Sequence, residues 1–245
     1  MCGIAGLIAP SGLAGEMLHA RASAMGQSLS HRGPDGAGTW AEPEVGLAFA
    51  HRRLAILDPS PAGAQPMVSA GGRYVVSFNG ELYNFAELRR ELAAQGHAFR
   101  GSGDTEVLLA SVEAWGVAGA LDRFVGMFAF ALYDMAARRL HLVRDRAGEK
   151  PLCFGLHNGV LLFGSELHAL RAHPAFDATL DRDAVAGFLA TGNVAAPRTI
   201  HRDTAKLPPG GHLAIALDRP LPATAELLSQ VRRYWRAADL ATADP

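Results

Sequence analysis

The stretch MCGIAGLIAP (residues 1–10) decides how this chain is interpreted, because it places a cysteine directly after the first methionine. The residues that follow Cys2 are small or apolar, so residues 2–9 are expected to form a buried strand. A chain terminus is normally poorly ordered unless the structure ties it down. We therefore expect the fold to hold Cys2 at a fixed place at the start of that strand.

Cys2 would carry two reactive groups once Met1 is removed, and this removal is expected because the next side chain is small. An α-amine has an unperturbed pKa of roughly 7.7–8.0, so a good fraction of it is unprotonated near neutral pH. Such an amine can accept the thiol proton, which makes one residue both nucleophile and base. The alternative is that Cys2 is a small buried hydrophobic residue, as most free cysteines are.

The composition is that of an ordinary globular chain, with 245 residues, 49% apolar and 19% charged, enough for one large domain or two small ones. A net charge of −1 gives no basic surface for nucleic acid or for an anionic membrane. No stretch approaches the roughly 20 apolar residues of a membrane span, and no signal peptide is evident. These features predict a cytoplasmic protein with no nucleic-acid or membrane partner.

The sequence does not indicate a metal or cofactor site. The ten histidines show no metal-ligand spacing, and no phosphate-binding loop is present. We therefore expect no metal and no cofactor in this chain. Cys2 and Cys153 are its two cysteines and lie far apart in the sequence, so a reducing compartment is the default, and a disulfide between them is the less favoured alternative.

Strand and helix patterns come in separate groups along the chain. The expected strands cover residues 45–51, 73–79, 127–134, 139–145, 151–156, 160–165 and 212–217. The expected helices cover residues 14–29, 84–96, 104–115, 166–173 and 183–190. Successive strands with short connections predict an α+β fold with antiparallel sheets.

Local signals add detail to this prediction. Asn84 and Glu87 have the spacing of a capping box at the start of the second helix. Gly116 is expected to end the third helix, and Asn158-Gly159 predicts a hairpin. Residues 31–39 are expected to form a polar, glycine-rich loop.

Eight motifs follow one another in a characteristic order: MCGIAGLI (1–8), HRGPDG (31–36), HRRLAILD (51–58), GAQPM (63–67), FNGELYN (78–84), SGDTEV (102–107), GMFAFALYD (126–134) and RDRAGEKPL (144–152). With them the chain resembles the glutaminase domain of glutamine-dependent asparagine synthetases, a class II glutamine amidotransferase. The resemblance extends over nearly the whole chain, because AAPRTI (195–200) and KLPPGGH (206–212) also match. It implies an N-terminal-nucleophile fold, an αββα sandwich of two antiparallel sheets flanked by helices.

The resemblance also implies a reaction, the hydrolysis of L-glutamine to L-glutamate and ammonia through a Cys2 thioester. The family forms its oxyanion hole from the positions that Asn79 and Gly80 match, through a side-chain N–H and a backbone N–H. Both residues are expected to lie in a tight turn. The alternative is that this Asn-Gly pair is a turn and nothing more.

Glutamine is a zwitterion, so its pocket needs a cation and an anion. Arg53 matches the family position that holds the α-carboxylate, which a guanidinium can bind through two hydrogen bonds. Arg52 is the adjacent alternative, but neighbouring residues of a strand face opposite ways, so both cannot serve. Either arginine could instead be a solvated surface residue. In the family, main-chain groups from Leu54 to Ile56 would line the same pocket.

Asp104 matches the family's partner for the α-ammonium group, with Glu81 close by. Asp104 also stands where a helix N-cap would be, and the two roles are compatible. The HRGPDG segment, which contains His31, is interpreted as a loop scaffold near the site. In this family the α-amine replaces the histidine that other thiol enzymes use as a base.

Other motif residues are expected to be structural. Asp145 and Arg146 are predicted to form ion pairs, and Cys153 to be inert core. Ala147 stands where the family usually has a large apolar residue, and Gly103 stands where a serine is more usual. These departures lie near or behind the site and leave the resemblance intact.

Asparagine synthetases continue into a second domain that binds ATP through a Ser-Gly-Gly-x-Asp-Ser motif, and this motif does not occur here. We expect residues 1–205 to form the glutaminase domain and residues 206–245 to lead toward that absent domain, to which ATP and Mg would belong. The chain would then be either a truncated N-terminal half or a free glutaminase with a separate synthetase partner.

The leading hypothesis is a glutaminase domain that supplies ammonia for ATP-dependent amidation of aspartate. One alternative is a glutaminase subunit that feeds another amide-forming ligase. The other is an inactive scaffold that only binds glutamine. Assembly as a homodimer is left open.

Overall fold

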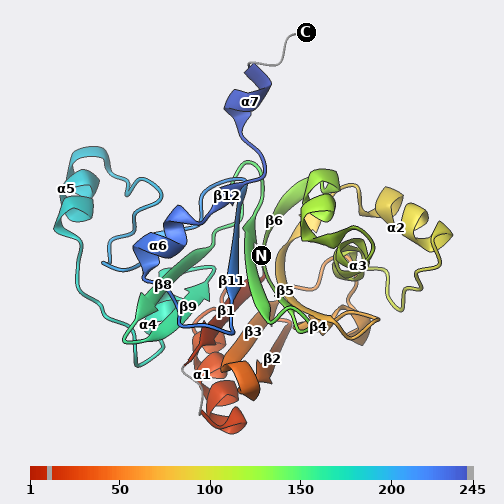
Figure 1. Cartoon of the computed structure of the whole chain (residues 1–245), viewed down its shortest axis with the longest axis horizontal. Coiled ribbons are helices and arrows are strands. Elements are labelled where there is room, and N and C mark those ends of the chain that lie inside the picture. The colour runs from red at the N-terminus through yellow and green to blue at the C-terminus, as the bar shows by residue number, and fades with distance from the viewer. Residues whose placement is uncertain (10–12, 242–245) are drawn as a thin grey trace.

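The computed structural model describes residues 1–9 and 13–241. Their strands form two six-stranded antiparallel sheets that pack face to face, with helices on both outer faces (Figure 1). This architecture is the predicted α+β sandwich.

The first sheet contains, from one edge to the other, β10 (Ala205–Lys206), β8 (Cys153–His157), β9 (Val160–Gly164), β1 (Gly3–Ile8), β3 (Leu47–Arg53) and β2 (Gly36–Glu42). The second contains β12 (Arg232–Arg233), β11 (Gly211–Ala216), β7 (Arg139–Arg144), β6 (Gly126–Asp134), β5 (Tyr74–Leu82) and β4 (Met67–Val68). The helices are α1 (Gly15–Gln27), α2 (Phe85–Ala94), α3 (Asp104–Arg123), α4 (Leu167–Arg171), α5 (Arg182–Thr191), α6 (Thr224–Ser229) and α7 (Ala237–Ala241), and two short 3-10 turns are η1 (Pro43–Val45) and η2 (Pro61–Gly63).

Alternation along the strands divides the apolar side chains into three layers. Ile4 of β1, Phe49 of β3 and Val75 of β5 belong to the cluster between the two sheets. The opposite face of the first sheet packs against α1 and α4, and the opposite face of the second packs against α2 and α3 (Figure 1). Burial of both faces of each sheet explains why the central strands read as continuous apolar runs.

The N-terminal strand is tied down as the sequence predicts. β1 lies between β3 and β9 and pairs antiparallel with both, and the pairing with β3 already begins at Gly3, opposite Arg52. A side chain at Gly6 would collide with the ring of Phe163 and with the backbone of β3, so this position has no room for one. Cys2 therefore directly precedes a central strand that is fixed on both sides.

Two local predictions can be compared directly with the backbone. Asn158 and Gly159 both have positive φ (48° and 79°) and join β8 to β9, which confirms the predicted hairpin. Gly116 interrupts α3 with φ 69° and ψ 171°, as expected of a helix-ending glycine, but a second helical segment continues to Arg123. The helix is therefore kinked at Gly116 and does not end there.

Two other local predictions are wrong. The expected loop over residues 31–39 becomes β2 from Gly36 onward, because this segment pairs with β3 in register from Gly36 opposite Arg53. The capping box at Asn84 does not form: its side chain donates to the carbonyl of Arg123 (2.9 Å) and accepts from the N–H of Val125 (3.0 Å). In both places, contacts distant in sequence override a local signal.

The C-terminal segment that starts at residue 206 contributes to the second sheet. β11 pairs with β7 on one side and with β12 on the other, and Leu213 and Ile215 of β11 belong to the core between the sheets. Among the described residues, no helix is both long and apolar enough to cross a membrane.

Candidate active site

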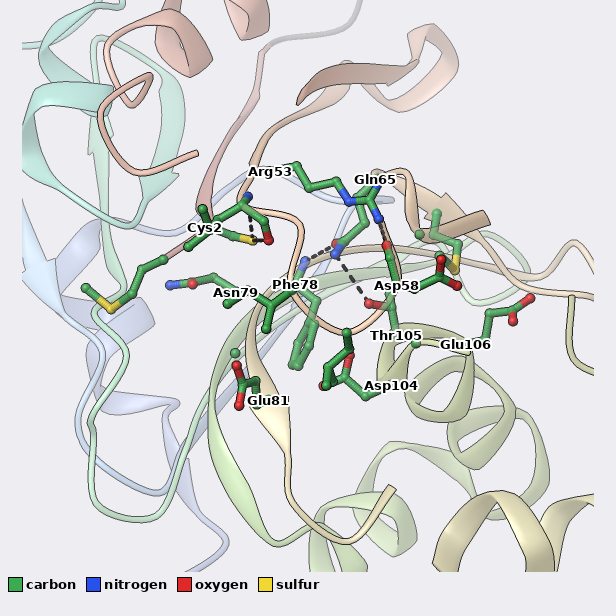
Figure 2. Close-up of a pocket in the computed structure, with 18 of the residues that line it drawn as sticks. Cys2, Arg53, Asp58, Gln65, Phe78, Asn79, Glu81, Asp104, Thr105 and Glu106 are labelled. Atoms are coloured by element: carbon green, nitrogen blue, oxygen red, sulfur yellow. Dashed lines mark hydrogen bonds between the residues drawn. The ribbon is translucent and has the colours of Figure 1, made fainter. Parts of the chain in front are cut away.

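A cavity of about 200 Å³ lies where the inner faces of three strands run out at one end of the sandwich (Figure 2). Side chains alternate along a strand, so Cys2 continues the inner face of β1 that carries Ile4. By the same alternation Arg53 continues the face of β3 that carries Phe49, and Asn79 continues the inner face of β5. The site thus lies at the open end of the core between the two sheets, where the inward-facing side chains of these strands change from apolar to polar.

All the predicted site residues line this one cavity: Cys2, Arg53, Leu54, Ile56, Asn79, Gly80, Glu81 and Asp104. The cavity is also lined by residues that sequence reasoning did not select, including Asp58, Gln65, Thr105, Glu106, Met127 and Lys150. In Figure 2 Cys2 and Arg53 lie above Asn79 in the view, and Glu81 and Asp104 lie below it.

The thiol of Cys2 is held by the segment that follows β3. The backbone N–H of Leu54 donates to Sγ at 3.4 Å, and Sγ lies 3.6 Å from the carbonyl oxygen of Leu54. Burial raises the pKa of the Cys2 thiol, and the Leu54 hydrogen bond opposes this effect. A buried thiol of this kind needs a nearby base before it can act as a nucleophile.

Arg32 fixes the other side of Cys2. Its Nε donates to the Cys2 carbonyl at 3.0 Å, and its Nη1 forms an ion pair with Glu166 at 2.6 Å. Asp35 of the same HRGPDG segment accepts the N–H of Ala55 at 2.9 Å. This geometry agrees with the interpretation of the segment as a scaffold, but the sequence did not show that Arg32 holds the nucleophile's own carbonyl.

Asn79 lies within β5, opposite Ala129 of β6, so the predicted tight turn at this position is wrong. Its side chain is buried, and its Nδ2 has no hydrogen-bond partner in the part of the chain that the structure describes. A buried donor without a partner is costly to fold. Asn79 lines the cavity that Cys2 also lines, so a ligand oxygen bound there could accept a hydrogen bond from this amide.

Gly80 also lies in β5, where a side chain would collide with the backbone of Met127 and Phe128 on β6. Successive N–H groups along a strand point to opposite edges, so those of every second residue share an edge. On the edge away from β6, the N–H of Phe78 donates to Gln65 (2.7 Å) and that of Leu82 donates to Asp104 (2.9 Å). The N–H of Gly80 lies between these two, on the edge that borders the cavity.

Arg53 and Arg52 point in opposite directions, as the alternation of a strand requires. Arg53 lines the cavity, and its guanidinium donates to the carbonyls of Ser60 (3.0 Å) and Asp58. Arg52 instead donates to the carbonyl of Gly33 at 3.2 Å. Of the two arginines, Arg53 is therefore the one that lines the cavity.

Asp104 is almost fully buried on the cavity wall, at 6% exposure. Desolvation raises the pKa of its carboxyl to about 6, against the lowering effect of the hydrogen bond from the Leu82 N–H. The predicted N-cap role is wrong, because Gly103 occupies the N-cap position and Asp104 is the first helical residue. From the first position of α3, its carboxylate accepts the N–H of Leu82 on β5.

Two residues near the start of the RDRAGEKPL motif (residues 144–152) depart from their predicted role. Asp145 accepts the backbone N–H groups of Phe128, Glu149 and Lys150, and Arg146 donates to the carbonyl of Asp122. Within the described ranges neither residue forms an ion pair, so that prediction is wrong. Asp145 instead shapes the loop that brings Lys150 to the cavity.

Cys153 is a free, buried cysteine on β8, and Cys2 is free as well. Burial raises the pKa of the Cys153 thiol to about 11, which agrees with an inert core residue. The disulfide alternative is absent from the described structure.

A family profile described as "Glutamine amidotransferase domain" matches residues 1–225. The chain belongs to this glutamine amidotransferase family. Its relatives include the glutamine-hydrolyzing asparagine synthetase 3 of Bacillus subtilis, 37% identical over 214 residues that cover 86% of this chain and 33% of the relative. A putative glutamine-hydrolyzing asparagine synthetase of Mycobacterium tuberculosis H37Rv is 38% identical over 237 residues, covering 91% and 36% respectively.

This glutamine amidotransferase chain therefore spans about a third of the length of these curated relatives. A solved structure, the glutamine phosphoribosylpyrophosphate amidotransferase of B. subtilis complexed with ADP and GMP, aligns with a TM-score of 0.66 at 20% identity. The alignment covers 96% of this chain and 49% of that one. At this level of identity the likeness shows a common fold.

Proposed function

We propose that this amidotransferase chain hydrolyses L-glutamine to L-glutamate and ammonia, with Cys2 as the nucleophile. The observation that carries the proposal is the unpaired, buried Nδ2 of Asn79, a residue that lines the same cavity as Cys2. A donor kept without a protein partner beside a nucleophile is the arrangement that a developing oxyanion requires.

The chemistry begins after Met1 is removed. The neutral α-amine of Cys2 takes the thiol proton, and the thiolate attacks the carbon of the side-chain carboxamide. The carbonyl oxygen becomes an oxyanion, which accepts hydrogen bonds from Asn79 Nδ2 and the Gly80 N–H. The ammonium form of the amine returns its proton to the leaving nitrogen, so ammonia departs and a thioester remains. Water then attacks the thioester with the amine as base, which releases L-glutamate.

Recognition of glutamine rests on two opposite charges on the cavity wall. The Arg53 guanidinium is the partner for the α-carboxylate, while Asp104 and Glu81 are the partners for the α-ammonium. Leu54 and Ile56 also line the cavity, and Leu54 contacts Sγ through its backbone. These charges select an α-amino acid, and their separation from Cys2 selects the length of its side chain.

We further propose that the ammonia serves an ATP-dependent synthetase. The proposal rests on the names of the longer relatives, of which this chain matches about a third. In that arrangement residues 1–205 form the glutaminase domain, residues 206–245 lead toward the synthetase part, and ATP and Mg belong to the latter. We place the reaction in the cytoplasm, where the two free cysteines would stay reduced. An inactive scaffold is less well supported, because the nucleophile, the donor and both charges are all in place.

Direct assay of the purified chain tests the proposal. Mass spectrometry first establishes that Cys2 is the N-terminal residue, and glutamate and ammonia are then measured after incubation with L-glutamine. We expect both products in equal amounts, and none from the Cys2→Ala chain. A processed chain that releases no ammonia, or a Cys2→Ala chain as active as the unchanged one, would overturn the proposal.

A further inference from the structure

Asp58 is a buried carboxylate on the cavity wall that sequence reasoning did not select. It is 7% exposed, and within residues 1–9 and 13–241 no Lys, Arg or His side chain forms an ion pair with it. Its oxygens instead accept backbone N–H groups, Oδ1 from Ser60 at 2.9 Å and Oδ2 from Ser102 at 2.8 Å. Hydrogen bonds from Ser60 and Ser102 hold the pKa of its carboxyl at about 2, so it is charged at any working pH.

The first of these bonds shapes the segment that holds Arg53. Ser60 lies two residues after Asp58 and begins the η2 turn. The carbonyl oxygens of Asp58 and Ser60 are the two acceptors of the Arg53 guanidinium. The Asp58 carboxylate therefore closes the turn whose two carbonyls orient the cation.

The second bond reaches the other side of the cavity. Ser102 belongs to the loop of residues 101–103, which leads directly into Asp104 at the start of α3. This loop lies so close to Asp58 that a side chain at Gly101 would collide with Oδ2, and one at Gly103 would lie 3.3 Å from Cβ. Arg89 holds the opposite side of the same loop through the carbonyls of Gly101 and Gly103, each at 2.9 Å.

We propose that Asp58 is a positioning residue that sets the distance between Arg53 and Asp104, and with it the preference of the site for an α-amino acid. The Asp58 carboxylate joins the segment that orients the Arg53 guanidinium to the loop that leads into Asp104. This inference rests on the proposed function, in which these two charges bind the α-carboxylate and the α-ammonium of glutamine.

The same geometry separates Asp58 from the chemical step. The groups that contact the thiol are the Leu54 backbone groups, and the Asn79 and Gly80 donors lie on β5. None of the hydrogen bonds of Asp58 reaches these residues. Loss of the carboxylate should therefore weaken substrate binding and leave the reactivity of the thiol unchanged.

Asp58→Asn is the sharpest substitution, because it keeps the shape and replaces one acceptor oxygen by a donor that faces a backbone N–H. Steady-state kinetics should show a KM for L-glutamine raised roughly tenfold to a hundredfold, with kcat within about threefold of the unchanged chain. Alkylation of Cys2 by iodoacetamide, which has no α-amino or α-carboxylate group, should keep its rate. Gly101→Ala, which presses on Oδ2 from the other side, should give the same pattern.

Asp134→Asn provides the matched control. Asp134 is also a buried carboxylate that binds a backbone N–H, that of Ala137, together with Arg73, and it lies outside the cavity lining. This variant should lose thermal stability without a change in KM. The inference is overturned if Asp58→Asn lowers kcat or slows alkylation with KM unchanged, or if Asp134→Asn raises KM equally.

Calorimetric binding of L-glutamine to the unreactive Cys2→Ala chain separates this inference from the proposed function. Affinity that falls roughly tenfold or more with Asp58→Asn supports the positioning role even when the unchanged chain fails to hydrolyse glutamine, a result that overturns only the proposed reaction. Equal affinity with and without Asp58→Asn overturns the positioning role whatever the activity.

Discussion

The candidate site has two halves with different structural supports. The strand half consists of Cys2, Asn79 and Gly80. Cys2 directly precedes β1, which is paired on both sides, and Asn79 and Gly80 lie on β5, which is paired with β6. The loop half consists of Arg53 at the end of β3 and Asp104 at the start of α3. The Arg53 guanidinium donates to the carbonyls of Asp58 and Ser60, and Asp104 directly follows the loop of residues 101–103. Groups on rigid strands are placed more accurately than groups on loops, which suits bond making and breaking.

This difference suggests a division of labour. The strand half would supply transition-state stabilisation and appear in kcat, whereas the loop half would supply binding of the amino-acid group and appear in KM. Each of the following experiments separates the two halves or shows that they act as one.

The largest effect is expected in the strand half. Asn79→Ala removes the buried amide donor, and kcat should fall roughly 10²–10³-fold while KM changes little, because the donor acts on an oxyanion formed only during the reaction. Steady-state kinetics with L-glutamine would measure both parameters. A rise in KM with kcat intact would assign Asn79 to binding and remove the proposed distinction.

A smaller effect is expected in the loop half. Arg53→Lys keeps the charge but loses the forked pair of donors, so KM should rise roughly tenfold to a hundredfold with kcat nearly retained. The control is Arg52→Lys, which alters the neighbouring arginine that faces away from the cavity. Equal effects of the two substitutions would contradict the assignment of Arg53 to the substrate carboxylate.

The pH dependence should show the two halves as separate transitions. The pKa of Asp104 is raised to about 6 by burial, so its carboxyl becomes protonated as pH falls through 6 and loses its attraction for the α-ammonium. KM should therefore rise by up to about tenfold per pH unit below 6. kcat should fall separately as pH drops through roughly 7.7–8.0, the unperturbed range of an α-amine, because a protonated Cys2 amine cannot accept the thiol proton.

Asp104→Asn is the check on this assignment, because an amide cannot titrate. Its KM should be high at every pH and should lose the transition near 6, while the kcat transition stays in place. Persistence of the KM transition in this variant would show that another group causes it.

The smallest effect is expected at Cys153. Its thiol is buried, with the pKa raised to about 11, and it takes no part in either half of the site. Cys153→Ala should leave kcat and KM unchanged and should not alter the amount of iodoacetamide taken up by the folded chain at pH 8. Loss of a labelled thiol in this variant would show that Cys153 is reactive.

The sequence predicted those parts of the fold and site that follow from alternation along strands. The two-residue period of β3 implied that only one of Arg52 and Arg53 could serve, and the resemblance selected Arg53. The same period explains why Cys2 and Asn79 lie at the edge of the core, because they continue the inward faces of β1 and β5. The glutamine pocket itself was predicted from a resemblance, not from these patterns.

Other features depend on contacts that no local pattern contains. Asn79-Gly80 has the sequence of a turn, but Gly80 is required because β6 lies against it. Asn84 has the spacing of a cap, but its amide binds the chain near Val125. Arg32 and Asp58 bind backbone carbonyls and N–H groups of distant segments, so their own sequence contexts gave no sign of their roles.

The pairing of β1 from Gly3 onward has a consequence for how the gene must be read and expressed. Because β1 is paired from Gly3 onward, we expect a chain with an affinity tag fused before Cys2 to fold normally. Such a chain would lack the free amine, and its fluorescence, stability and solubility would not reveal the defect. Under the proposed function, a residue placed before Cys2 would remove the base and leave the fold in place.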